Sequence, residues 1–288
     1  MKKIAMVTDT NSGITPAEAQ RLGIYVIPMP VLIDGETYYE GINLTHEEFY
    51  EKLAADASVS TSQPSPGAVM DMWDEVLKEH EELLYFPMSS GLSSSCETAM
   101  MLAEDYDGRV HVVDNQRISV TLARSILDAM ELRDRGYSAG EIKAKLEEVK
   151  LDASIYIMVD TLKYLKKGGR LTPAVAALGT LLRIKPVLQI QGEKLDNYAK
   201  ARTVAQAKST MIAALKNDIE TRFGGVENQK VWLGVAYTDD LKAAEVLKEE
   251  LLAAMPGYTE VMLAPLSLSV SCHIGPGAIG VGCMKKLD

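Results

Sequence analysis

The sequence predicts an α/β fold in two domains: an N-terminal parallel sheet flanked by helices and a C-terminal α+β domain. Short apolar strands alternate with helices as far as residue 160, and such alternation is typical of a parallel sheet covered on both faces. Beyond residue 161 the order changes to a hairpin followed by longer helices. We therefore place the domains at residues 1–160 and 161–288.

The elements of the N-terminal half begin at recognisable signals. Three capping boxes, in which a hydroxyl and an acid three residues later satisfy free backbone N–H groups, mark helix starts. They are Thr15 with Glu18, Thr45 with Glu48, and Ser138 with Glu141. Asp34-Gly35 is a hairpin-turn signal. The predicted strands are residues 3–8, 25–33, 36–39, 83–86, 109–113 and 154–159, and the predicted helices start near residues 15, 45, 65, 93, 119 and 138.

The C-terminal half contains fewer strand–helix alternations. Residues 162–167 form one or two helical turns, and Thr172-Pro173 starts another helix. Residues 191–193 are the turn of a predicted antiparallel hairpin. The predicted strands are residues 184–190, 194–200, 231–237, 259–265 and 278–284, and the predicted longer helices are residues 203–223 and 240–254.

Composition excludes several classes of function. The net charge is −10 at pH 7, which disfavours nucleic acid and anionic membrane surfaces as partners. No apolar stretch approaches the roughly 20 residues that span a bilayer. The three cysteines and four histidines show no metal-ligand spacing, so we expect no metal. A reduced cytoplasm fits this cysteine content best.

A serine-rich loop follows the strand at residues 83–86 and opens a helix. Ser93 or Ser94 is the expected N-cap, with Glu97 completing a capping box. Gly91 allows the backbone to turn. Backbone N–H groups at such a helix start attract anions, and the loop contains hydroxyls but no Lys or Arg. This chemistry suits a carboxylate or phosphate held by neutral donors, although a serine-rich cap without a ligand is an equal alternative at this point.

A second hydroxyl-rich segment lies at residues 58–67, where Thr61-Ser62-Gln63 is stiffened by two prolines. Taken alone it is a linker. One helix and one strand separate it from the serine loop, so both can face the same crevice.

Near the C-terminus, His273 is followed by a Gly-Pro-Gly turn that can present it at a crevice. Gly275, Gly277 and Gly280 match GxGxxG, but a dinucleotide fingerprint needs a full helix after it, and the chain ends at residue 288. The glycines instead permit tight turns beside His273.

Four motifs in this order resemble the DegV family of bacterial fatty-acid-binding proteins, over essentially the whole chain. They are Thr61-Ser62-Gln63-Pro64-Ser65, Ser89-Ser90-Gly91-Leu92-Ser93, Gly168-Gly169-Arg170 and His273-Ile274-Gly275-Pro276-Gly277. Val7-Thr8-Asp9-Thr10 and Asp160-Thr161-Leu162-Lys163-Tyr164-Leu165 are also similar to the family. The chain departs from it at Ser94 and Ser95, where Gly and Thr are frequent, and at Asn11, where a hydroxyl is common.

The resemblance implies a long-chain fatty acid lying between the two domains. Thr61 and Ser93 would hydrogen-bond its carboxylate, backbone N–H groups around Ser62 and Gly91 would assist, and His273 would lie close by. A separate fatty acid kinase would phosphorylate the bound carboxylate to an acyl phosphate. The protein itself would have no catalytic residue and no cofactor, and we expect a bacterial, cytoplasmic monomer. Whether it serves phospholipid metabolism or lipid sensing stays open.

A basic island contains Lys163, Lys166, Lys167 and Arg170. Because the protein as a whole is acidic, we predict that Arg170 faces the kinase or the transferring phosphoryl group rather than the lipid. A solvated helix end that complements the helix dipole is the alternative.

Two rival functions remain. The first is a phosphosugar-binding enzyme or regulator that uses the serine-rich loop, although that loop lacks basic residues. The second is a serine hydrolase built from Ser93, His273 and either Asp9 or Asp114, although the chain lacks a GxSxG elbow.

Overall fold

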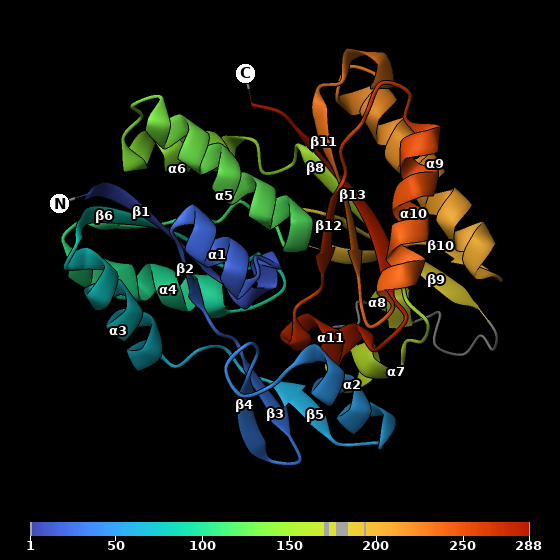
Figure 1. The fold of residues 1–288 in the computed structure, drawn as a ribbon, viewed down its shortest axis with the longest axis horizontal. Coiled ribbons are helices and arrows are strands. Elements are labelled where there is room, and N and C mark those ends of the chain that lie inside the picture. Colours follow the sequence, from blue (N-terminus) through green and yellow to red (C-terminus); the bar gives the residue numbers. More distant parts are fainter. Residues whose placement is uncertain (1, 170–172, 177–183, 193, 288) are drawn as a thin grey trace.

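The computed structural model of the protein describes residues 2–169, 173–176, 184–192 and 194–287 (Figure 1). Three sheets organise this part of the chain: a four-stranded parallel sheet, a three-stranded antiparallel sheet and a six-stranded mixed sheet. The predicted fold class is confirmed, with a parallel sheet flanked by helices in the N-terminal half and a mixed sheet with helices in the C-terminal half.

The N-terminal sheet has the strand order β2-β1-β6-β7, with all neighbours parallel. Its strands are β1 (Lys2–Asp9), β2 (Ile24–Ile27), β6 (His80–Phe86) and β7 (Val110–Val112). Apolar residues of α5 (Ser119–Asp134) and α6 (Ala139–Glu148) pack on one face, and those of α3 (Pro66–Leu77) and α4 (Ser95–Ala103) pack on the other. On α3 the buried residues Val69, Trp73 and Val76 recur at helical spacing and so form one apolar face.

Most of the predicted helix starts are confirmed. Thr15 caps α1 (Pro16–Leu22), and Thr45 caps α2 (His46–Ala54), each through a complete capping box. Ser138 does the same for α6. Ser94 is the N-cap residue of α4, at one of the two predicted positions, but its side chain makes no capping bond. The hydroxyl of Ser93 instead accepts the N–H of Ser95 at the helix start.

A small antiparallel sheet corrects the prediction for residues 25–33. The segment is two strands instead of one, because the chain leaves the parallel sheet at Pro28, which has no N–H to continue the ladder. β3 (Pro30–Ile33) then pairs with β4 (Glu36–Tyr39) and with β5 (Val59–Thr61). The Thr61 segment, which the sequence indicated as a linker, is therefore an edge strand with a fixed side-chain direction.

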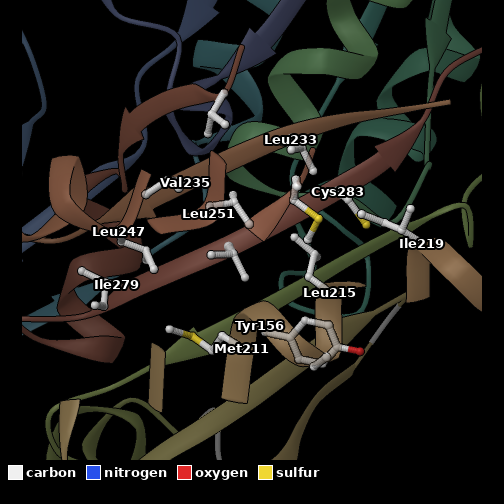
Figure 2. Close-up of a cluster of buried hydrophobic side chains, with 14 of the residues drawn as sticks. Tyr156, Met211, Leu215, Ile219, Leu233, Val235, Leu247, Leu251, Ile279 and Cys283 are labelled. Atoms are coloured by element: carbon white, nitrogen blue, oxygen red, sulfur yellow. The ribbon is translucent and has the colours of Figure 1, made fainter. Parts of the chain in front are cut away.

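The C-terminal sheet has the order β10-β9-β8-β13-β11-β12. Its strands are β8 (Ala153–Met158), β9 (Lys185–Gln191), β10 (Lys194–Ala201), β11 (Val231–Tyr237), β12 (Met262–Pro265) and β13 (Ile279–Lys285). The helices α9 (Val204–Arg222) and α10 (Leu241–Ala254) cover one face, where they bury the core shown in Figure 2. There Met211 and Leu215 of α9, with Leu247 and Leu251 of α10, lie against strand residues such as Ile279.

Strand β8 corrects a second prediction. We expected residues 154–159 to close the parallel sheet, but β8 pairs antiparallel with β13 and with β9 in the middle of the C-terminal sheet. An apolar run of six residues suits either sheet, and the partner strands that decide between them come later in the sequence. We propose on this ground that the C-terminal domain begins near Ala153, before the boundary predicted at residue 160.

The remaining short elements are α7 (Lys163–Lys167), α8 (Pro173–Ala176) and α11 (Leu268–Ile274), with 3-10 turns at Thr10–Ser12, Glu104–Tyr106 and Val226–Asn228. Figure 1 shows α11 between the small sheet and the C-terminal sheet, beside α7. Helix α5 contacts β1 on one side and β11, β12 and β13 on the other, so it joins the two larger sheets. Within the described residues, no helix has the length and apolarity needed to cross a bilayer.

Candidate functional site

A cavity lies between the N-terminal elements and the inner face of the C-terminal sheet. Its volume is about 130 Å³, roughly ten times the space that one water molecule requires. One part of the lining is polar and consists of Thr61, Ser62, Gln63, Ser93 and His273. The rest is mostly apolar and comes from α5, β8, β9, β13 and α11. None of the described residues that line it is Lys, Arg, Asp or Glu.

The polar end is more exposed than the apolar walls, most of whose residues are buried. Ser62 is exposed, and Thr61, Ser93 and His273 are half-buried. Ile157 and Leu165 are among the buried residues of the walls. The cavity can thus hold an elongated apolar molecule with a polar group at its mouth.

Thr61 and His273 meet at this mouth. The hydroxyl of Thr61, at the end of β5, lies 2.9 Å from Nε2 of His273, in the last turn of α11. A hydroxyl can both donate and accept, so this pair can still offer a hydrogen bond to a ligand.

Helix α11 was not predicted, since the sequence indicated only the turn that follows His273. The small sheet and α2 fix the helix in place. The carboxylate of Glu40 accepts a hydrogen bond from the N–H of Leu268 over 2.8 Å, and the Tyr50 hydroxyl lies 2.9 Å from that of Ser271. Burial raises the pKa of Tyr50, so this hydroxyl stays protonated. These tertiary contacts orient the turn that carries His273.

Two glycines of the sequence motifs allow α7 to approach α11. A Cβ added at Gly168 would overlap Nδ1 of His273, and one added at Gly275 would overlap the ring of Tyr164. Gly275 also has a φ of +75°, which favours glycine. The Gly168-Gly169 and His273-to-Gly277 motifs are therefore two halves of one contact that sets the position of the imidazole.

The serine-rich loop is held by hydrogen bonds of its own. Ser90 donates to the carboxylate of Asp114 over 2.6 Å. Ser93 accepts from the N–H of Ser95 over 3.2 Å and lies 3.0 Å from the hydroxyl of Ser95. Ser93 lines the cavity with its oxygen engaged at the start of α4.

Asp9 supports this loop from beneath. It is buried at the carboxyl end of β1 and accepts the N–H groups of Asn11 and Met88, over 2.8 and 2.9 Å. Burial, the largest effect, raises its pKa from 3.8 to about 6, although both N–H groups lower it. Because Met88 lines the cavity, Asp9 positions part of its wall.

Four of the five predicted ligand-binding residues come together here: Thr61, Ser62, Ser93 and His273. Gly91 is not among the residues that line the cavity, and its N–H donates to Ser89 Oγ over 3.3 Å. Its predicted contact with a ligand would require that bond to break. Arg170 lies outside the described residues.

Sequence reasoning missed the cavity walls on β13 and at the start of α5. Gly280 and Gly282 line the cavity at alternate positions of β13 and so face the same side of the sheet. Glycines at alternate positions inside a strand indicate that another group approaches the strand closely, and this spacing is the signal in the sequence for the cavity wall. Ile118, Ser119 and Val120 line it from the start of α5.

The acids of the rival hydrolase are engaged elsewhere. Asp9 accepts backbone N–H groups, and Asp114 accepts from Ser90. Neither acid is therefore the partner that would orient His273 in a triad. Within the described residues, no group of three His, Cys, Asp or Glu side chains could hold a metal ion.

Comparison with known proteins places this sequence and fold in a family. The sequence profile described as "Uncharacterised protein, DegV family" matches residues 3–286. A DegV domain-containing protein of Staphylococcus aureus is 31% identical over 99% of this chain and 100% of its own length. One from Streptococcus pneumoniae is 34% identical, over 97% of this chain and 98% of its own length.

Solved structures agree. A DegV family protein from Thermus thermophilus, described by its fatty acid binding, superposes with a TM-score of 0.89 at 31% identity, covering 98% of this chain and 99% of its own. DegV from Bacillus subtilis, described as a fatty acid binding protein, gives a TM-score of 0.86 at 29% identity, covering 99% and 100%. The chain described here therefore belongs to the DegV family.

Proposed function

We propose that this protein binds a long-chain fatty acid in the cavity between its two larger sheets, with the carboxylate at Thr61, Ser62, Ser93 and His273. The observation that carries the proposal is the division of the cavity into a mouth of uncharged donors and a buried apolar wall. Structural relatives described as fatty-acid-binding support it. The test is whether protein purified from cells without added lipid carries a fatty acid, as detected by native mass spectrometry.

The division of the cavity assigns separate roles to tail and headgroup. Burial of each methylene contributes about 0.8 kcal/mol, so the tail supplies most of the affinity. Hydroxyl donors stabilise the ionised carboxylate by roughly 1.5–3 kcal/mol per bond. With no lysine or arginine in the described lining, the carboxylate keeps an oxygen that is not locked in an ion pair.

We further propose that the protein presents this carboxylate to a separate fatty acid kinase and does no chemistry itself. A carboxylate oxygen would attack the γ-phosphorus of ATP held by the kinase, forming an acyl phosphate as ADP leaves. The exposed position of Ser62 at the mouth is consistent with access from outside. Lys163 and Lys167 of the neighbouring α7 are also exposed, and with Arg170 they would form the surface that meets the kinase.

The presentation step can be tested with lipid-loaded protein, a fatty acid kinase and ATP, with the acyl phosphate trapped by hydroxylamine. We expect Arg170→Ala to keep lipid affinity and to lose acyl-phosphate formation. Arg21→Ala, at an exposed arginine in the last turn of α1, is the matched control and should behave as wild type. Loss of lipid binding in Arg170→Ala would instead place Arg170 in the cavity.

We propose a cytoplasmic monomer. The three cysteines are buried thiols, which fits a reducing compartment.

The phosphosugar alternative has no specific support in the described lining, because that lining contains no basic residue to pair with a phosphate. A thermal shift with sugar phosphates but none with lipids would revive it.

A further inference from the structure

Two hydroxyls line the cavity apart from its polar mouth, those of Ser119 and Ser269. Ser269 donates to Oδ1 of Asn11, so Ser119 is the one that is left without a partner among the described residues. Ser119, the first residue of α5, lines the cavity between Ile118 and Val120. Its side chain is only 4% exposed, and its hydroxyl has no hydrogen-bond partner among the described residues. Buried hydroxyls normally have a partner, because burial without one costs free energy. An unpaired hydroxyl on a cavity wall therefore points to the molecule that fills the cavity.

The neighbours of Ser119 belong to the apolar wall. Val120 lies against the C-terminal sheet, where a Cβ added at Gly234 would be 2.7 Å from its Cγ2 and one added at Gly282 would be 3.5 Å away. The mouth residues have partners of their own, since Thr61 meets His273 and Ser93 meets Ser95. Ser119 thus belongs to the part of the cavity where the acyl chain would lie.

We infer that the preferred ligand is a long-chain fatty acid with a hydroxyl on its acyl chain, and that Ser119 hydrogen-bonds this hydroxyl. The inference rests on the proposed fatty acid binding and narrows its ligand class. A plain saturated chain leaves the Ser119 hydroxyl unpaired in apolar surroundings, whereas a chain hydroxyl can both donate to it and accept from it.

The backbone at Ser119 guides the choice of variants. Its φ is +55°, a region that residues other than glycine seldom adopt. Ser119→Ala removes the hydroxyl and keeps the Cβ, and Ser119→Gly removes the hydroxyl and relaxes the backbone. Ser119→Gly is therefore used as the second variant if Ser119→Ala lowers the yield of folded protein. Ser125→Ala is the matched control, since Ser125 is a fully buried serine of the same helix that bonds Arg117 and does not line the cavity.

The experiment measures competition with a fluorescent fatty acid, using stearic acid and a positional series of monohydroxystearic acids. In wild type and in Ser125→Ala we expect one position of the hydroxyl to bind about tenfold more tightly than stearic acid, the gain of one good hydrogen bond. In Ser119→Ala and Ser119→Gly this preference should vanish, while stearic acid binds as well as before or better.

Three outcomes would overturn the inference. No hydroxystearic acid binds more tightly than stearic acid, as expected if a water molecule bonds Ser119, or the preference for one isomer persists in the Ser119 variants. In the third outcome both Ser119 variants lose affinity for stearic acid itself, which would place Ser119 at the headgroup. Failure of wild type to bind stearic acid or any of its hydroxylated isomers would instead refute the proposed function.

Discussion

The hydroxyl of Thr61 and Nε2 of His273 lie 2.9 Å apart, although 212 positions separate them in the chain. Thr61 ends an edge strand of the small sheet, and His273 lies in a helix that the same sheet anchors. The mouth of the cavity therefore depends on contacts between segments that lie far apart in the chain.

Removal of the mouth hydroxyls should weaken lipid binding. Thr61→Val keeps the side-chain shape and removes one donor, and Ser93→Ala removes another. Each should lower fatty-acid affinity about tenfold, because a hydrogen bond to a charged group contributes roughly 1.5–3 kcal/mol. Fluorescent-lipid competition measures this. Ser60→Ala, at an exposed residue of the same strand, is the control. Unchanged affinity in both Thr61→Val and Ser93→Ala would remove these residues from the headgroup site.

Gly168→Ala should displace the imidazole of His273, because the added methyl group would overlap Nδ1. We expect lower lipid affinity with a folded protein, measured by competition and by thermal unfolding. Gly67→Ala is the control, since nothing lies within 4 Å of a Cβ at that helical position. Wild-type affinity in Gly168→Ala would show that the ring can move without consequence for binding.

The variants His273→Leu and His273→Gln distinguish the contribution of the side chain's packing to lipid binding from that of its hydrogen bonds. Leu fills the space without a polar atom, whereas the Gln amide reaches the region of Nε2 and can still bond Thr61. Binding should fall about tenfold in His273→Leu, the value of a bond to the carboxylate, and should recover in part in His273→Gln. If His273→Leu binds lipid as well as wild type, the histidine is structural.

Asp9 should make stability depend on pH. Its pKa is about 6 in the folded protein and 3.8 ordinarily, so the folded form retains a proton that the unfolded chain releases. Stability is therefore highest below pH 4 as far as this group is concerned, and it falls as pH rises toward 6. At 1.36 kcal/mol per pKa unit, the loss is about 3 kcal/mol.

Urea denaturation of wild type and Asp9→Asn between pH 4 and 7 isolates this contribution, since other groups titrate alike in both proteins. The free energy of unfolding of wild type, relative to Asp9→Asn, should fall by roughly 2.4 kcal/mol as pH rises through this range, because the unfolded-state carboxyl is already partly ionised at pH 4. A difference that does not change with pH would mean that Asp9 is not held with a raised pKa.

Local chemistry made much of the fold predictable, and long-range pairing explains what was not. The capping boxes at Thr15, Thr45 and Ser138 involve neighbours in sequence, so the sequence alone located these helix starts. The sheet to which β8 belongs is decided by its pairing with β13, in which Met158 lies opposite Ile279. No local sequence pattern in β8 indicates that partner strand. Helix α11 has only seven residues and is held by Glu40, which follows β4, and by Tyr50 of α2, both far away in the sequence.

The candidate site was predicted to a similar extent. The mouth residues were found because their motifs resemble a family, and the structure brings Thr61, Ser62, Ser93 and His273 to one cavity. The cavity wall around Ser119 contains no sequence motif. Ser119 lines the cavity only because the C-terminal sheet packs against α5, and that packing cannot be read from the local sequence. The resemblance also implied that Gly91 lies beside the ligand, yet its N–H is directed to Ser89.

The most direct test of fatty acid binding is native mass spectrometry of protein purified from cells without added lipid. A preformed apolar cavity should retain a host fatty acid through purification, because the free acid is poorly soluble and its methylenes each contribute about 0.8 kcal/mol to burial. We expect a mass excess that matches a long-chain fatty acid and an organic extract that contains it. An apo mass, an extract without fatty acid and no uptake of added oleate, palmitate or hydroxystearate would contradict the proposed function.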